Sequence, residues 1–62
     1  MRYAIDAAGI EVEFVGGGVY RYDHLSLEPE TLESMKRLAV AGQGLAAFIR
    51  RYAYRGYAYR IR

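Results

Sequence analysis

The chain has 62 residues and a mass of 7.1 kDa, which is enough for one small domain. It has no cysteine and one histidine, which excludes disulfides and thiolate metal sites and argues against a histidine-based catalytic centre. Hydrophobic residues make up 53% of it, too many for a disordered segment. Residues 1–33 carry two basic and seven acidic side chains, a balance of −5, whereas residues 34–62 carry seven basic ones and no acid, a balance of +7.

Three short strands are predicted over residues 1–22. Residues 10–14 alternate strictly between apolar and acidic side chains, the pattern of a strand that is buried on one face. The triplet Gly16–Gly18 then predicts a hairpin with a three-residue loop, which places Glu13 opposite Arg21. A two-residue loop would instead turn Arg21 toward the core, so the three-residue loop is favoured.

The turn before this hairpin, residues 6–9, has an aspartate at its start and a glycine, Gly9, where a positive φ is favoured. As a four-residue loop it pairs Ile5 with Ile10. The three strands then form an antiparallel meander with one apolar and one charged face. The apolar face holds Met1, Tyr3, Ile5, Ile10, Val12, Phe14, Tyr20 and Tyr22, and the charged face holds Arg2, Glu11, Glu13, Arg21 and Asp23.

Two helices are expected to cover the apolar face. The first begins at Pro29, whose missing N–H is not needed in the first turn. Gly42 and Gly44 are expected to break the chain and cap this helix. In it, Glu33 and Arg37 are spaced for an i,i+4 ion pair. The second runs from about Leu45 to Tyr52. The buried stripes are Leu32, Met35, Leu38 and Ala39 in the first helix, and Leu45, Phe48, Ile49 and Tyr52 in the second.

Residues 52–62 contain the pattern Tyr-Ala-Tyr-Arg twice. The second copy has the period of a strand, with Tyr57, Tyr59 and Ile61 on one side. We expect either a fourth strand from Tyr57 onward or a frayed terminus. The predicted fold is a single two-layer α+β domain over residues 1–62, with two helices on one face of a three-stranded antiparallel meander and a strand-like tail. Its predicted core is Tyr3, Ile5, Val12, Phe14, Tyr20, Leu32, Met35, Leu38, Leu45, Phe48 and Ile49.

An aromatic–x–aromatic motif follows the glycine turn, and a second set of glycine, aliphatic, basic and aromatic residues comes later. These residues are Gly17, Gly18, Tyr20 and Tyr22, then Gly42, Leu45, Ile49, Arg50, Tyr52 and Tyr54. In their order and spacing the chain resembles the KTSC domain family, small modules found alone in bacterial and phage proteins and at the C-terminus of some lysyl-tRNA synthetases. It departs from the family at Leu25-Ser26, where a Val-Pro step is usual, and at Ala46, often asparagine. An RNA-binding role has been suggested for that family, so the resemblance implies one here.

The C-terminal part of the chain interleaves arginines with tyrosines. The cluster consists of Arg50, Arg51, Arg55, Arg60 and Arg62 with Tyr52, Tyr54, Tyr57 and Tyr59. Arginine contacts phosphates through two N–H groups at once, and both residue types stack on unpaired bases. This pattern predicts a non-enzymatic module that binds RNA or another single-stranded nucleic acid. Two alternatives remain open: the arginines pair with the acidic sheet face, or the chain is a protein-interaction module, as a monomer or weak homodimer.

The other candidate sites favour structural interpretations. Tyr20 and Tyr22 are predicted on the core face and not as free stacking platforms. The glycine triplet lacks the lysine and the following helix of a phosphate-binding loop. His24 is expected at the surface, and no nucleophile–base pair or metal-ligand set occurs, so we expect no enzyme, cofactor or metal. No signal peptide or membrane-spanning run is recognised, which predicts a cytoplasmic protein without a membrane partner.

Overall fold

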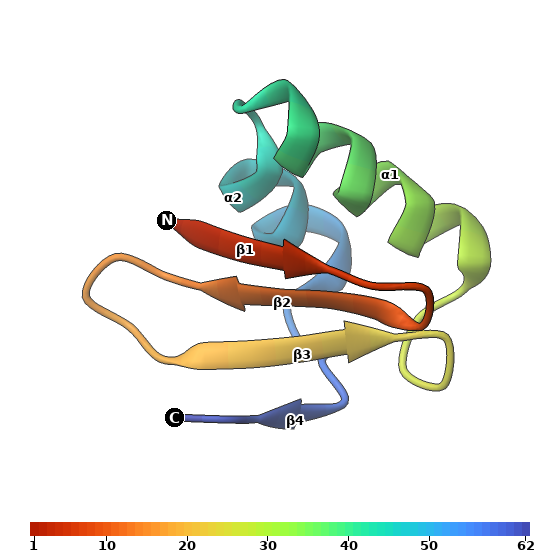
Figure 1. Ribbon diagram of the computed structural model, residues 1–62, viewed down its shortest axis with the longest axis horizontal. Helices are drawn as coiled ribbons and strands as arrows, with labels where there is room; N and C mark the ends of the chain where they lie inside the picture. The colour runs from red at the N-terminus through yellow and green to blue at the C-terminus, as the bar shows by residue number, and fades with distance from the viewer.

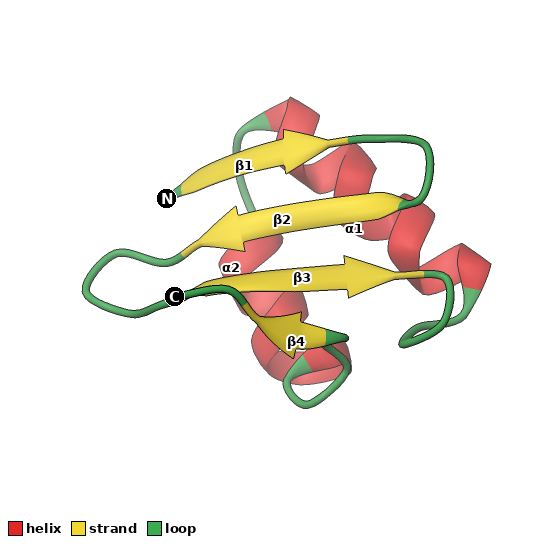
Figure 2. Cartoon of the chain, turned by 60° about the horizontal axis from the view of Figure 1, so that its bottom comes forward, coloured by secondary structure: helices red, strands yellow, loops and turns green.

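Four strands form one antiparallel sheet in the order β1-β2-β3-β4, and a helical layer covers one of its faces (Figures 1 and 2). The computed structural model describes all 62 residues. The elements are β1 (Arg2–Ile5), β2 (Gly9–Glu13), β3 (Val19–Asp23), α1 (Pro29–Ala41), α2 (Leu45–Phe48), η1 (Ile49–Ala53) and β4 (Tyr59–Arg60). The predicted two-layer α+β fold is confirmed.

The β1–β2 hairpin has the predicted register, with Ile5 opposite Ile10. Its turn is held by the Asp6 carboxylate, whose Oδ1 accepts hydrogen bonds from the backbone N–H groups of Ala8 (2.9 Å) and Gly9 (2.8 Å). The expected positive φ at Gly9 is wrong. The glycine is instead required because a Cβ at this position would overlap the carbonyl oxygen of Tyr22 on β3.

The β2–β3 register differs by two residues from the predicted one, because Arg21 lies opposite Glu11 and not Glu13. A turn forms one residue earlier than expected: Gly17 N–H donates to Phe14 C=O, and Phe14 N–H donates to Gly18 C=O, both at 3.1 Å. Gly16, with φ +73°, takes the position of the turn that needs a positive φ. A shift by two leaves every side chain on its predicted face, so Tyr20 and Tyr22 still face the helices.

Helix α1 begins at Pro29 and ends at Gly42, as predicted. Gly42 has φ +82° and its N–H donates to the carbonyls of Leu38 and Ala39. The predicted Glu33–Arg37 ion pair is wrong. Glu33 pairs with Lys36 at 3.4 Å, and Arg37 donates to the Ser34 hydroxyl at 3.1 Å. Lys36 is held on that side because its ammonium also donates to the backbone oxygen of Asp6 at 3.1 Å.

The second helix runs further than predicted and changes its geometry. The α-helical turn α2 continues directly into η1, a π-helical segment that ends at Ala53. Leu45, Ile49 and Ala53, spaced four residues apart, are buried, while Tyr52 is 63% exposed. The prediction that Tyr52 is buried is wrong, because a π turn is wider than an α turn and rotates i+4 neighbours onto one face.

One hydrophobic core fills the space between the sheet and the helices. Its buried members are Ile10, Val12, Tyr22, Leu32, Met35, Ala39, Leu45, Ile49 and Ala53, and the partly buried Phe14, Tyr20, Leu27, Leu38 and Phe48 pack against them. The predicted core residues Tyr3 and Ile5 are 46% and 40% exposed. They lie on β1, an edge strand with no neighbour on its outer side, whereas α1 packs on β2.

The tail forms a fourth strand, one of the two outcomes expected for it, but the strand begins at Tyr59 and not at Tyr57. Arg60 lies opposite Tyr20 and Tyr59 opposite Arg21, and the pairing continues where Ile61 N–H donates to Val19 C=O (2.7 Å). The expectation that Tyr57 and Tyr59 share a side is wrong, since the chain bends at Ala58. Tyr57 packs against the helix-facing Tyr20, whereas Tyr59 shares the opposite face with Arg21.

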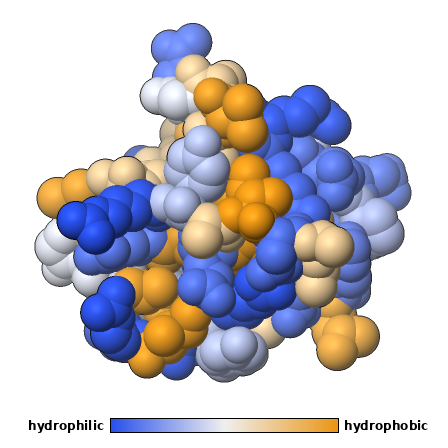
Figure 3. Space-filling model, viewed as in Figure 1, coloured by the Kyte–Doolittle hydropathy of each residue, from blue (hydrophilic) through white to orange (hydrophobic).

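Hydrophobic side chains that remain at the surface form small groups among hydrophilic ones (Figure 3). Neither the length nor the hydropathy of any helix suits it to crossing a membrane.

Candidate nucleic-acid interface

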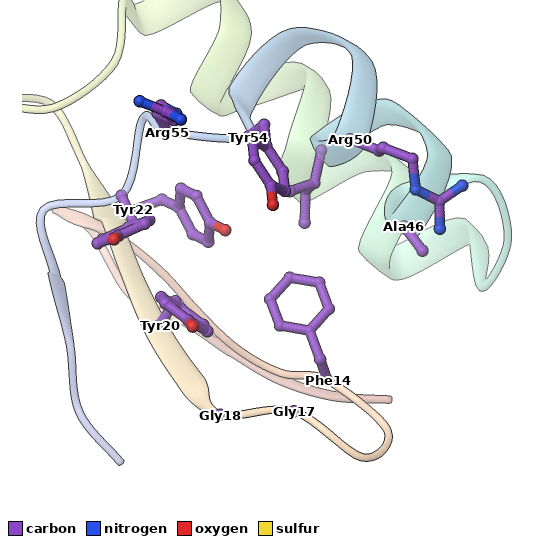
Figure 4. Close-up of a pocket in the computed structure, with 11 residues that line it drawn as sticks. Phe14, Gly17, Gly18, Tyr20, Tyr22, Ala46, Arg50, Tyr54 and Arg55 are labelled. Atoms are coloured by element: carbon purple, nitrogen blue, oxygen red, sulfur yellow. The ribbon is translucent and has the colours of Figure 1, made fainter.

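A cleft of about 610 Å³ opens between the helix-facing side of β3, the β2–β3 turn and the α2–η1 segment (Figure 4). Its lining includes five aromatic residues and two arginines, and it includes no acidic residue. These seven residues are Phe14, Tyr20, Tyr22, Tyr54, Tyr57, Arg50 and Arg55. The volume is typical of ligand pockets in proteins.

The sheet side of the cleft is a group of aromatic rings in mutual contact. Tyr20 lies edge-on to Phe14, with ring centroids 5.7 Å apart, and its ring is 4.8 Å from that of Tyr57. Tyr57 also lies edge-on to Tyr22 at 6.4 Å. Alternation along β3 turns Tyr20 and Tyr22 to the same side, and the bend before β4 brings Tyr57 onto them. The group therefore combines residues more than thirty positions apart in the chain.

The helical side of the cleft comes from α2, η1 and the turn that follows. Ala46 on α2 has a short side chain, which leaves room in the cleft, and Arg50 lies one turn later. Tyr54 and Arg55 follow the end of η1 and are exposed. Figure 4 shows the Tyr54 ring pointing into the cleft toward Phe14 and Tyr20, whereas the Arg50 side chain extends along the helical side, past Ala46. The π segment and the turn that follows it thus give this wall an aromatic ring and two cationic groups.

Tyr22 is 1% exposed, yet it lines the cleft. Its hydroxyl makes no hydrogen bond within the protein. Every polar side-chain atom that is fully buried does have a hydrogen-bond partner, so the Tyr22 hydroxyl is not fully buried. The hydroxyl is therefore the part of Tyr22 that reaches the cleft. Burial, and then the neighbouring Tyr20 and Tyr57, raise the pKa of Tyr22 to about 12. The hydroxyl stays protonated at neutral pH and can both donate and accept a hydrogen bond.

The arginines of the C-terminal cluster have no acidic side chain as a partner. The ion pairs of the structure involve Arg21 and Lys36 as their cations. Arg50, Arg51 and Arg55 are exposed. These guanidinium groups are available to contact phosphates.

The structure divides the predicted nine-residue cluster. Arg50, Tyr54, Arg55 and Tyr57 come together in the cleft, whereas Arg51 is exposed on η1 and does not line it. Arg60 does not line the cleft. Its guanidinium lies over the ring of Tyr20, 5.5 Å from the centroid, and its Nε donates to the backbone oxygen of Arg62 at 2.8 Å.

Two tyrosines of the predicted cluster lie elsewhere. Tyr52 packs against Phe48, with ring centroids 5.0 Å apart, in a shallow groove beside Glu30 of α1. Tyr59 lies on the helix-free face of the sheet, beside Arg21. The backbone of Arg62 is held beside β3, because its carbonyl oxygen accepts a hydrogen bond from Val19 N–H at 2.9 Å.

Three residues of the cleft, Phe14, Tyr20 and Tyr22, were predicted on the core face of the sheet and not as part of the binding site. Their face was correctly predicted, but the opening above them depends on the course of η1, for which the sequence pattern gives no signal. Arg21 lies on the predicted charged face of the sheet, but the expectation that it is solvated there is wrong. It is 8% exposed, and its guanidinium donates to both carboxylate oxygens of Asp6 (2.8 and 3.0 Å).

The chain matches no protein-family model, no curated protein and no solved structure at a significant level. No three His, Cys, Asp or Glu side chains lie close enough together to hold a metal ion. The chemistry of the cleft therefore carries the functional argument.

Proposed function

We propose that this chain is a small non-enzymatic module that binds RNA or another single-stranded nucleic acid through the cleft. The observation that carries the proposal is the lining itself, which combines five aromatic rings with Arg50 and Arg55 and contains no acidic residue. Unpaired bases stack on aromatic side chains at about 1–3 kcal/mol each, and arginines contact the adjoining phosphates.

Two further features support the proposal. The cluster arginines have no acidic side-chain partners, so ion pairs within the protein do not neutralise their positive charge. The resemblance to the KTSC family agrees with it, because an RNA-binding role has been suggested for that family. On this proposal the protein acts in the cytoplasm, where it meets RNA.

Fluorescence anisotropy with labelled single-stranded RNA tests the proposal. With Arg50, Arg51 and Arg55 on three phosphates, the logarithm of the affinity falls with the logarithm of the salt concentration at a slope of about −2, from about 0.7 per contact. An absence of binding at tens of micromolar protein in low salt contradicts the proposal.

Charge-reversal variants locate the site. Arg50→Glu and Arg55→Glu each place a carboxylate at the cleft and should weaken RNA binding by at least tenfold. Arg37→Glu is the matched control, because Arg37 is exposed on α1, makes only a hydrogen bond to Ser34, and lies outside the cleft. If all three variants weaken binding equally, the attraction depends on net charge and the cleft is not the site.

A further inference from the structure

The Tyr22 hydroxyl is not explained by stacking and phosphate contacts. Tyr22 is 1% exposed and its ring is part of the core, so the residue is held rigidly. Its hydroxyl nevertheless has no partner in the protein and opens into the cleft. A buried residue of this kind aims one hydrogen-bonding group, with donor and acceptor capacity, at whatever enters.

The groups around this hydroxyl define the chemistry of an occupant. Tyr20 and Tyr57 contribute aromatic rings beside it, and Arg50 and Arg55, both exposed, line the helical side of the cleft. An occupant that satisfies all of them is flat and aromatic, has polar atoms on its inner edge and carries negative charge on its outer side. Phosphate alone leaves the rings unused, and an apolar peptide side chain leaves the hydroxyl and both arginines unpaired. A nucleobase attached to its phosphate satisfies every group.

We propose that the cleft takes a single unstacked nucleobase, edge first, and that Tyr22 determines specificity by hydrogen bonding to the edge of that base. This inference rests on the proposed function and narrows it. The module selects one base from a loop, a bulge or a strand end, which is where RNA presents unpaired bases. Arg50 and Arg55 hold the adjoining phosphates and give affinity without reading sequence.

Tyr22→Phe tests the inference because it removes one oxygen and leaves the ring in place. Affinities are measured for four short RNAs that differ only at one central unpaired base. The wild-type protein should prefer one base, and Tyr22→Phe should lose about three- to tenfold in affinity for that base, the effect of one neutral hydrogen bond, and little for the others. Tyr52→Phe is the matched control, since Tyr52 is exposed and lies outside the cleft.

A second variant guards against a change in folding. Ala46→Phe adds a ring to the cleft from α2 while keeping Arg50 and Arg55. It should abolish the base preference and leave a weak, salt-sensitive residual binding. Nuclear magnetic resonance with nucleoside monophosphates gives an independent readout: the Tyr22 ring signals should shift with the preferred monophosphate and not with ribose 5-phosphate.

The outcomes separate the two proposals. If the wild-type protein binds all four RNAs equally and Tyr22→Phe behaves like Tyr52→Phe, the single-base inference is overturned while the nucleic-acid proposal stands. If the wild-type protein binds no RNA, and its Tyr22 signals shift with no monophosphate, both are overturned.

Discussion

Arg21 illustrates how a single side chain joins separate segments on the helix-free face of the sheet. Its guanidinium on β3 makes two hydrogen bonds to Asp6 in the first turn and lies 3.7 Å from a Glu11 carboxylate oxygen on β2. At 8% exposure this cation has little water around it and needs acceptors from the protein. The pairing therefore fixes the first turn onto β3.

The same pairing predicts how stability depends on pH. The hydrogen bonds from Arg21, followed by those from the Gly9 and Ala8 N–H groups, hold the pKa of Asp6 well below its usual range. A carboxyl whose pKa is lower in the folded state stabilises the fold above the unfolded-state pKa of about 4, and this contribution is lost as the pH falls further. Thermal unfolding of the wild-type protein should therefore show a melting temperature that declines below about pH 4.

The Asp6→Asn variant checks this origin of the acid sensitivity. It should melt at a lower temperature at pH 7 and lose less on acidification, because the group that titrates is gone. Glu28→Gln is the control, since Glu28 is exposed and its side chain makes no hydrogen bond or ion pair. If the melting temperatures of Asp6→Asn and the wild-type protein decline equally on acidification, the acid sensitivity arises from other groups.

Gly18 and Gly17 are adjacent, but they differ in what a side chain would meet. A Cβ on Gly18 would overlap the backbone oxygen of Arg62 and crowd the Arg60 guanidinium, whereas one on Gly17 would lie 3.3 Å from the Cβ of Phe14. Gly18→Ala should therefore displace β4 and abolish hydrogen-exchange protection at the amide of Ile61. Gly17→Ala should leave that protection nearly unchanged, and equal losses in both would contradict this account.

At the scale of the element, η1 decides which residues of the second helix are buried. Ala53 is 2% exposed and Tyr52 is 63% exposed, the reverse of what an α-helical period indicates. Ala53→Leu should overpack the core and destabilise the protein by about 1–3 kcal/mol. Tyr52→Ala loses mainly its contact with Phe48, which amounts to about 1 kcal/mol. Urea unfolding measures both, and a larger loss for Tyr52→Ala would mean that the segment is α-helical in solution.

Local rules predicted the ends of elements well. Pro29 and Gly42 bound α1 because proline lacks an N–H that the first helical turn does not need, and glycine readily adopts the left-handed conformation after the last turn. The register of β2 and β3 was wrong by two residues, because a period-2 pattern fits equally well after a shift of two, and only the turn decides between the two fits. Tyr3 and Ile5 have the correct face but are not buried, since alternation does not tell an edge strand from a central one.

At the scale of the whole molecule, the cleft joins the two halves of the chain. The arginines and Tyr54 come from the basic half and could be identified from the sequence as candidates. Tyr20 and Tyr22 come from the acidic half, and they meet Tyr57 only because β4 pairs with β3. That pairing was one of two predicted outcomes for the tail. The sequence therefore identifies the charged and aromatic residues of the basic half as candidates. It does not show which distant segments meet in the fold to complete the cleft.

The ion pairs of the structure leave the arginines of the C-terminal cluster without acidic partners, and this predicts an unusual response to salt. The five arginines of the cluster repel one another and have no acidic side-chain partner to offset this, whereas the buried Arg21 is paired with Asp6. The distance over which exposed charges still interact, the Debye length, falls from about 10 Å at 0.1 M salt to about 3 Å at 1 M. Salt screens buried pairs much less. Sodium chloride should therefore raise the melting temperature of the protein.

Arg62→Gln identifies the source of this effect, because the Arg62 side chain is exposed and makes no hydrogen bond or ion pair, while the backbone contact with Val19 is retained. The variant should melt at a higher temperature than the wild-type protein in low salt, and the difference should disappear in high salt. If sodium chloride instead lowers the melting temperature, and Arg62→Gln lowers it further, the arginines are neutralised within the fold. That result would favour the self-neutralised interpretation of the sequence over a free basic surface that attracts phosphates.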